Sequence, residues 1–359
     1  GNYYRFNFTK DNGPSSHWSY LYSIIQNCNL ILMNVDKLSI DEDETEYKND
    51  LKGQALAIRG MALFDLTRIF GYPYLKDNGA SLGVPIVKEL STIDSKPARN
   101  TVAECYTEII SDLKNSTELL SGDFNKGKVN RWAAMTLLSR VYLYKGEYNE
   151  ALTMAENAIK GAEKEGYALW TNEEYPTAWG NDASASNPGE ILFEIVNLTT
   201  DSPGKESMGY LNSYNGYDDM CITCSFYQLL KKDPKDVRLK ILSFDKKYYA
   251  YVNKYQPQQG ENITDANIPL IRLSEAYLNA AEAAVQTGDN AKAVKYLNSI
   301  VQRANPENSV EGKTLTLENV LDERRKELVA EGHRMYDVIR NGMTVKRIDE
   351  IGRASCRER

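Results

Sequence analysis

The chain has 359 residues, with 43 Lys and Arg against 50 Asp and Glu, which gives a formal net charge of −7. This length allows a large buried core in one or two domains, and the negative charge disfavours binding to nucleic acid. Tyrosine is abundant, because 24 Tyr stand against 8 Phe, 4 Trp and only 2 His. Two histidines exclude a three-histidine zinc site, and rings with a polar tip favour a binding surface over a hydrolytic centre.

The first part of the chain is predicted to be helical. Apolar side chains recur at helical spacing over 18–38 and again over 51–70. The second of these helices is expected to stop at the Gly-Tyr-Pro sequence that begins at Gly71. After an irregular stretch, Thr101 followed three residues later by Glu104 has the pattern of a capping box, which predicts the start of a further helix.

Two distant segments, 131–161 and 272–301, align without a gap when Gly146 is superposed on Gly288. In each, a helix rich in small apolar residues ends at glycine followed by an acidic residue, and a second helix begins at once. The matched positions are Leu138 with Ala280, Tyr142 with Ala284, Ala151 with Ala293, and Ala158 with Ile300. This recurrence predicts a tetratricopeptide-like pair of antiparallel helices in both places, with an ordinary helical hairpin as the alternative.

Between these pairs, residues 166–267 change in character. Gly, Asn, Ser and Pro become frequent, the helical period fades, and 191–196 is predicted to be a short strand. This stretch holds 10 of the 24 tyrosines and 2 of the 4 tryptophans. It is therefore interpreted as an aromatic-rich, loop-dominated insertion, and loops on a rigid scaffold commonly carry binding residues.

The last predicted element is one amphipathic helix over 321–341. Its charges run in clusters, and Asp337 is expected to pair with Arg334 and Arg340 at helical spacing. Residues 352–359 are expected to be a non-native or truncated tail.

Several motifs in order resemble one known family. They are a first helix with Trp18 that ends in Asn34-Val35-Asp36-Lys37-Leu38; Gln54-Ala55-x-x-Ile58-Arg59-Gly60-x-Ala62-x-Phe64-Asp65-Leu66-x-Arg68-Ile69-Phe70-Gly71-x-Pro73; Gly83-Val84-Pro85; Ile268-Pro269-Leu270-Ile271-Arg272-Leu273-Ser274-Glu275-Ala276-Tyr277-Leu278; and Glu323-Arg324-Arg325-x-Glu327-Leu328-x-x-Glu331-Gly332-x-Arg334. Together they resemble the SusD/RagB family of Bacteroidetes over most of the chain. The terminal motif usual in that family is not among them.

The resemblance implies a mainly α fold, with a tetratricopeptide-like helical-pair scaffold and an insertion containing short strands. A single SusD-like domain over 1–359 is expected, with its scaffold at 15–165 and 268–350 and a ligand-binding insertion at 166–267. Such proteins are lipid-anchored at the outer-membrane surface, bind a nutrient, usually a glycan, and work with a SusC-like TonB-dependent transporter. They are not enzymes. The lipid anchor and its signal are absent from this sequence.

A glycan site needs flat rings to stack on sugar faces and polar groups to hydrogen-bond the rim. The insertion supplies both, so its rings are the candidate ligand-binding residues, together with two that flank Pro73. The candidates are Trp170, Tyr175, Trp179, Tyr210, Tyr214, Tyr217, Tyr72 and Tyr74. The alternative is that these rings fill the core of the insertion or pack within loops. The segment 246–255 alternates like a strand, for which sheet packing is favoured over a binding platform.

Other sites and functions are less well supported. Cys221 and Cys224 have the spacing of half a zinc site, but no second pair completes it, and a free pair or a local disulfide is expected instead. No cofactor, metal or catalytic residue is implied. The charge cluster of 323–340 is interpreted as a salt-bridged structural helix, with a transporter-docking face as the alternative. A peptide-binding adaptor and a carboxylate glycosidase remain as alternative functions.

Overall fold

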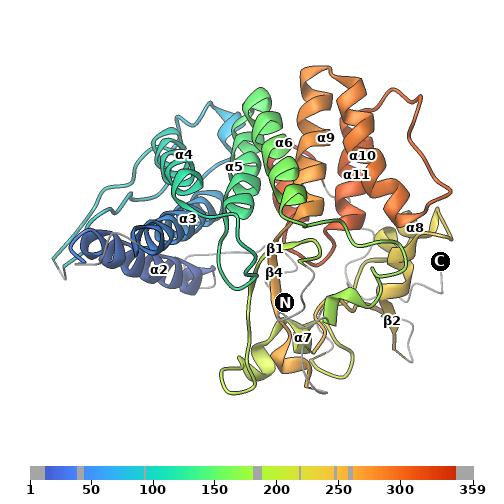
Figure 1. Cartoon of the computed structure of the whole chain (residues 1–359), viewed down its shortest axis with the longest axis horizontal. Helices are drawn as coiled ribbons and strands as arrows, with labels where there is room; N and C mark the ends of the chain where they lie inside the picture. Colours follow the sequence, from blue (N-terminus) through green and yellow to red (C-terminus); the bar gives the residue numbers. More distant parts are fainter. Residues whose placement is uncertain are drawn as a thin grey trace. The chain divides into compact units, whose positions relative to one another are not determined.

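The computed structural model describes residues 13–38, 44–92, 94–180, 188–217, 220–245, 249–257 and 262–344. Its described residues are mainly helical, with a few short strands (Figure 1). The helices are α2 (Ser15–Val35), α3 (Thr45–Phe70), α4 (Val102–Leu119), α5 (Arg131–Lys145), α6 (Tyr148–Lys164), α7 (Met208–Leu211), α8 (Cys224–Lys231), α9 (Leu273–Thr287), α10 (Asn290–Ala304), α11 (Leu317–Glu327) and α12 (Arg334–Arg340). The strands are β1 (Ile191–Ile195), β2 (Leu242–Phe244), β3 (Ala250–Val252) and β4 (Ile268–Arg272). The predicted fold class is confirmed.

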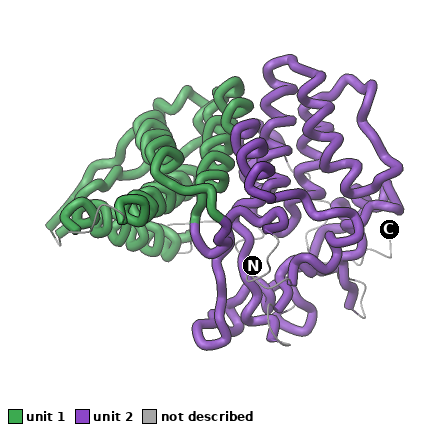
Figure 2. Tube along the Cα trace, in the orientation of Figure 1, with its two compact units in different colours: residues 1–123, 129–154 green, residues 124–128, 155–359 purple. Residues whose placement is uncertain are grey.

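The chain forms two compact units (Figure 2). The first comprises residues 1–123 and 129–154, and the second comprises 124–128 and 155–359. The insertion predicted at 166–267 is thus not a compact unit by itself, because it shares the second unit with the C-terminal helices. That a single domain covers the whole chain stays a prediction, and the tail at 352–359 lies outside the described residues.

In the first unit, one buried arginine links three helices. Arg59 on α3 donates two hydrogen bonds to Asp112 on α4, at 2.8 and 2.7 Å, and a third to Asn29 on α2, at 2.9 Å. Two predicted helix boundaries are confirmed here, whereas α2 is shifted by three residues from 18–38 and α3 starts six residues before 51. Helix α3 ends at Gly71, and Thr101 and Glu104 form the capping box that begins α4.

The two predicted helical pairs share their turn geometry. Gly146 and Gly288 both adopt a left-handed conformation, with φ of 82° and 81°. In both, the next residue returns its N–H to the carbonyl five positions earlier, Glu147 to Tyr142 and Asp289 to Ala284, at 3.0 and 2.9 Å. These bonds define the same Schellman-type helix end, so the predicted correspondence is confirmed at the level of backbone geometry.

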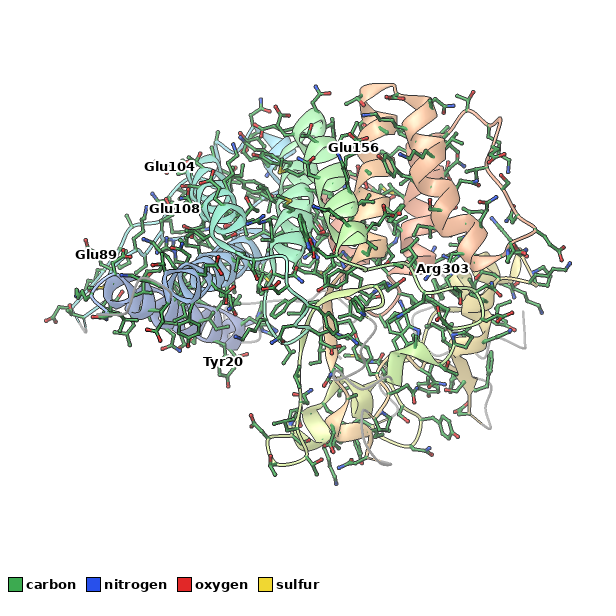
Figure 3. All side chains as sticks on the ribbon, viewed as in Figure 1. Tyr20, Glu89, Glu104, Glu108, Glu156 and Arg303 are labelled. Carbon is green, nitrogen blue, oxygen red and sulfur yellow. The ribbon has the colours of Figure 1, made fainter. Side chains whose placement is uncertain are left out.

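Within the second unit, Glu156 on α6 accepts hydrogen bonds from Lys292 and Tyr296 on α10, at 3.0 and 2.8 Å (Figure 3). Strand β1 pairs antiparallel with β4, so the segment before α9 is joined to the insertion. The strand predicted at 191–196 is confirmed to within one residue. Strands β2 and β3 form a second antiparallel pair. Every residue of β3 is buried, as expected for sheet packing, and 246–248 lie outside the described residues.

The single helix predicted over 321–341 is wrong. The structure divides it into α11 and α12, because Ala330 and Gly332 have positive φ angles of 65° and 80° and turn the chain between the two helices. The turn itself carries Glu331, whose carboxylate belongs to the buried network described next. Asp337 does pair with Arg340, at 2.7 Å, as predicted.

A buried ionic network lies where α10, α11, β4 and the insertion meet. Glu327 on α11 is fully buried and faces three guanidinium groups, those of Arg303, Arg272 and Arg238, at 2.6, 3.2 and 3.3 Å. Arg303 is labelled in Figure 3. The members of the network are Arg238, Lys254, Arg272, Arg303, Asp236, Glu190, Glu323, Glu327 and Glu331. This is the structural interpretation of the C-terminal charge cluster, in place of a docking face.

The network sets the ionisation of its carboxylates. Burial alone would raise the pKa of Glu327, but the three facing guanidinium groups outweigh burial and hold that pKa well below its usual range. Glu331 behaves in the same way, because Arg272 and Lys254 lower its pKa. A carboxylate with a depressed pKa in the folded state stabilises the fold at neutral pH. That stabilisation is lost as the pH falls below about 4 toward the folded-state pKa.

The left-handed turn at Gly288 can be tested by two substitutions. Replacing Gly288 by Ala is expected to lower the free energy of unfolding by about 1 kcal/mol, because a Cβ strains the left-handed conformation although the space around it is open. Gly288→Asn should cost less, since Asn tolerates this conformation. Denaturant unfolding checks both variants, and an Ala variant as stable as the unaltered chain would contradict the role of the turn.

Breaking the network should be far more costly than breaking a surface ion pair. Glu327→Gln is expected to lower the free energy of unfolding by about 3–5 kcal/mol, because buried guanidinium groups lose their counter-charge. The control is Glu307→Gln, whose partner Lys235 is largely exposed, for which less than about 1 kcal/mol is expected. Unfolding followed by tryptophan fluorescence measures both, and equal losses would show that the network contributes little.

Candidate functional site

Three predicted site residues lie in the core. Trp170, Tyr175 and Trp179 are only 8%, 0% and 5% exposed, and their rings meet edge to face with centroids 4.9–6.2 Å apart. They also cover the ionic network. Arg272 and Lys254 lie over the ring of Trp179, at 4.9 and 4.7 Å from its centroid. Their burial favours the alternative that these three rings fill the core of the insertion, and their contact with a ligand stays a prediction.

Asn172, the polar residue beside these rings in the sequence, also has a structural role. Asn172 donates hydrogen bonds of 2.9 Å to the carbonyl groups of Arg303 and Ala304, at the end of α10. Aromatic rings that alternate with amide side chains are expected at a sugar site. The same pattern also suits a protein core, where an amide side chain can donate hydrogen bonds to the free carbonyl groups at the end of a helix. Asn181 and Asp182, from the same cluster, lie outside the described residues.

The two tyrosines beside Pro73 belong to the first unit. Tyr74 begins a short 3₁₀ helix (Tyr74–Lys76) and packs edge to face on Tyr106, with centroids 5.1 Å apart. Tyr72 is exposed, and the ammonium group of Lys76 lies over its ring. Tyr74 therefore has a packing role, whereas the edge of Tyr72 remains open to solvent.

The remaining predicted rings gather on one loop of the second unit, residues 207–217, which we call the tyrosine loop. Ser207 caps the single turn of α7, and the Tyr217 N–H returns to the Tyr210 carbonyl at 3.3 Å. This closure places the rings of Tyr210 and Tyr217 edge to face, 5.1 Å apart. Tyr214 and Tyr217 are each 46% exposed. Of the predicted site residues, these are the ones that the structure brings together with open surface.

The loop depends on close backbone contacts. A Cβ on Gly216 would lie 1.9 Å from the Tyr210 carbonyl oxygen, and one on Gly209 would lie 2.1 Å from that of Ile263. Only glycine fits at such distances. The hydroxyl group of Ser202 donates to the Thr264 carbonyl at 2.9 Å and holds the preceding segment to the same short helix, Ile263–Asp265. Two glycines therefore allow the close backbone contacts that hold this exposed loop in position.

The described residues supply no metal centre. Among them, no three His, Cys, Asp or Glu side chains gather in a group that could hold a metal ion. Cys221 and Cys224 are half-buried and are not joined in a disulfide. The chemistry available at the tyrosine loop is therefore that of exposed phenol rings and of the amide side chain of Asn215.

Comparison with known proteins identifies the family. Residues 241–354 match the family model described as SusD family, and 3–143 match one described as starch-binding associating with outer membrane. A crystal structure described as a putative sugar binding protein from Bacteroides vulgatus ATCC 8482 is 98% identical, with a TM-score of 0.96, over 99% of this chain and 79% of that one. A SusD superfamily protein from Bacteroides thetaiotaomicron VPI-5482 is 37% identical, with a TM-score of 0.86, over 94% and 77%. The chain belongs to the SusD superfamily.

A further relative is a SusD-like protein from Bacteroides ovatus, which is 24% identical over 92% of this chain. The chain spans 66% of the length of that protein. The predicted family is confirmed, and the structure explains two of the motifs that carry the resemblance. The segment 268–278 supplies Arg272, and the segment 323–334 supplies Glu323, Glu327 and Glu331, so both meet in the ionic network.

The shape of the tyrosine loop can be tested at Gly216. Gly216→Ala is expected to open the turn, because the clashing atom is a backbone oxygen that no side-chain rotation can move. The bond from Tyr217 to Tyr210 should then be lost, so hydrogen exchange should accelerate in peptides covering 207–217. Asn215→Ala is the control, since its side chain is exposed and the N–H that bonds Ser213 is kept. Equal exchange in both variants would contradict the close contact.

Proposed function

We propose that this protein binds an oligosaccharide through the exposed rings of the tyrosine loop, without changing it chemically. The observation that carries the proposal is the pair Tyr214 and Tyr217, each about half exposed on a loop that glycine contacts hold in shape. Sugars present weakly apolar C–H faces to such rings, and their hydroxyl groups take hydrogen bonds from amides such as Asn215. Tyr72 is proposed separately, as a ligand-contacting residue of the first unit.

The relatives support a carbohydrate ligand. One is the starch-binding protein SusD of Bacteroides thetaiotaomicron, which is 36% identical over 97 residues. Structures with the same fold, 22% and 20% identical, are described as a laminarin binding SusD-like protein and as a complex with xylogluco-oligosaccharide. Starch, laminarin and xyloglucan fragments are therefore the first ligands to try.

The non-enzymatic part of the proposal has chemical support. A glycosidase needs a carboxylic acid with a raised pKa that reaches the substrate. Burial raises the pKa of Glu194 and of Asp112, but both are buried, and they bond Asn267 and Arg59, respectively. Neither carboxyl group is presented to a ligand. A tetratricopeptide-like adaptor would bind peptides on its helices and leave the tyrosine loop without a use.

Location and delivery complete the proposal. We infer association with the outer membrane, on its surface, through an N-terminal lipid anchor, and delivery of the glycan to a SusC-like TonB-dependent transporter. Support comes from the family model described as associating with outer membrane. None of the described helices has the length and apolar character needed to cross a membrane.

Calorimetric titration tests the site. Maltoheptaose, laminarihexaose and a xyloglucan oligosaccharide are titrated into the chain, and each mixture is analysed for products. Tyr214→Ala and Tyr217→Ala should each weaken binding by about 1–3 kcal/mol, the usual worth of one stacked ring.

The control is Tyr20→Ala. Tyr20 is 71% exposed and projects from α2, so its loss should leave the affinity unchanged (Figure 3). Unchanged affinity in both loop variants would place the site elsewhere, and released sugar would contradict the non-enzymatic proposal. Peptide binding without glycan binding would favour the adaptor.

A further inference from the structure

A buried tyrosine lies directly behind the tyrosine loop. Tyr251, on β3, has no exposed surface, and its ring centroid is 6.1 Å from that of Tyr214. Tyr214 is about half exposed, so a fully buried ring and a solvent-facing ring lie next to each other here. The segment that follows the loop is held beside the same strand, since the Ile222 N–H donates to the Ala250 carbonyl at 2.8 Å.

The hydroxyl group of Tyr251 has no hydrogen-bond partner among the described residues. The next buried tyrosine along the chain differs, because the Tyr255 hydroxyl donates to the Ala330 carbonyl at 2.7 Å. Burying a hydroxyl group without a partner is unfavourable, and such groups in native proteins usually have a structural or functional explanation. Here the ring that carries the group is the neighbour of Tyr214, which belongs to the surface that we propose binds sugar.

We propose that the Tyr251 hydroxyl group hydrogen-bonds a hydroxyl group of the bound oligosaccharide when the Tyr214 side chain rotates aside. The inference rests on the proposed function and names a deeper contact of the same site. Rotation of an exposed side chain is fast and needs no change in the backbone. A sugar hydroxyl can both donate and accept, so it can satisfy the phenol in either direction. The loop rings then contact the sugar face, and Tyr251 selects sugars with a hydroxyl group pointing toward β3.

Tyr251→Phe removes the hydroxyl group and keeps the ring. Because the described part of the chain gives the group no partner, the unfolding midpoint should stay the same or rise. The affinity for whichever oligosaccharide of the panel binds best should fall about 3- to 10-fold, the usual effect of losing one neutral hydrogen bond. Tyr175→Phe is the matched control, since it removes another buried hydroxyl group without a partner, from a ring that lies against Arg303 and the ionic network. The affinity of the Tyr175→Phe variant for the same oligosaccharide should not change.

The two proposals fail in different ways. If Tyr251→Phe lowers the unfolding midpoint and leaves the affinity unchanged, the hydroxyl group has a structural partner such as an ordered water, and only the inference is overturned. The same holds if Tyr251→Phe and Tyr175→Phe weaken binding equally. If the unaltered chain binds none of the oligosaccharides, the proposed function and this inference are both overturned.

Discussion

The second unit depends on the burial of Glu327 among three guanidinium groups. Burying one charge without partners would cost more than most folds can tolerate, so each member requires the others. The arginines come from the segment before β2, from β4 and from α10, which are far apart in sequence. Their common carboxylate therefore fixes how three parts of the unit pack. The ionic network also accounts for the break between α11 and α12, because the turn between these helices places Glu331 against Lys254 and Arg272.

The ionic network also decides how aromatic residues are used. Trp179 and Tyr175 lie against its cations, where their ring faces replace water around groups that cannot be hydrated. The faces of these rings are therefore in contact with protein cations. The exposed rings sit instead on a loop whose shape depends on backbone contacts at Gly209 and Gly216. Buried and exposed roles thus fall to different aromatic residues of the same insertion, and in our proposal the exposed ones contact the ligand.

The family resemblance and the proposed binding site occupy different residues. Motif residues Arg272, Glu323, Glu327 and Glu331 form the network, whereas the tyrosine loop belongs to none of the motifs. A pattern that encodes buried ion pairs tolerates little change, since a lost partner leaves a buried charge. A loop that meets a ligand can vary with the ligand. The motifs therefore identify the superfamily without identifying the sugar.

The amino-acid sequence by itself determined the local structure. The helix end at Gly71, the capping box at Thr101 and the matched turns at Gly146 and Gly288 all follow from short-range backbone chemistry, and the structure contains each of them. Burial was decided only by tertiary structure. Trp170 and Tyr214 stand in similar mixtures of rings and amides, yet one is in the core and the other is half exposed. The difference arises because Arg303, over 130 residues farther along the chain, lies over the ring of Tyr175, which packs against Trp170. Periodicity within a segment carries no information about such a partner.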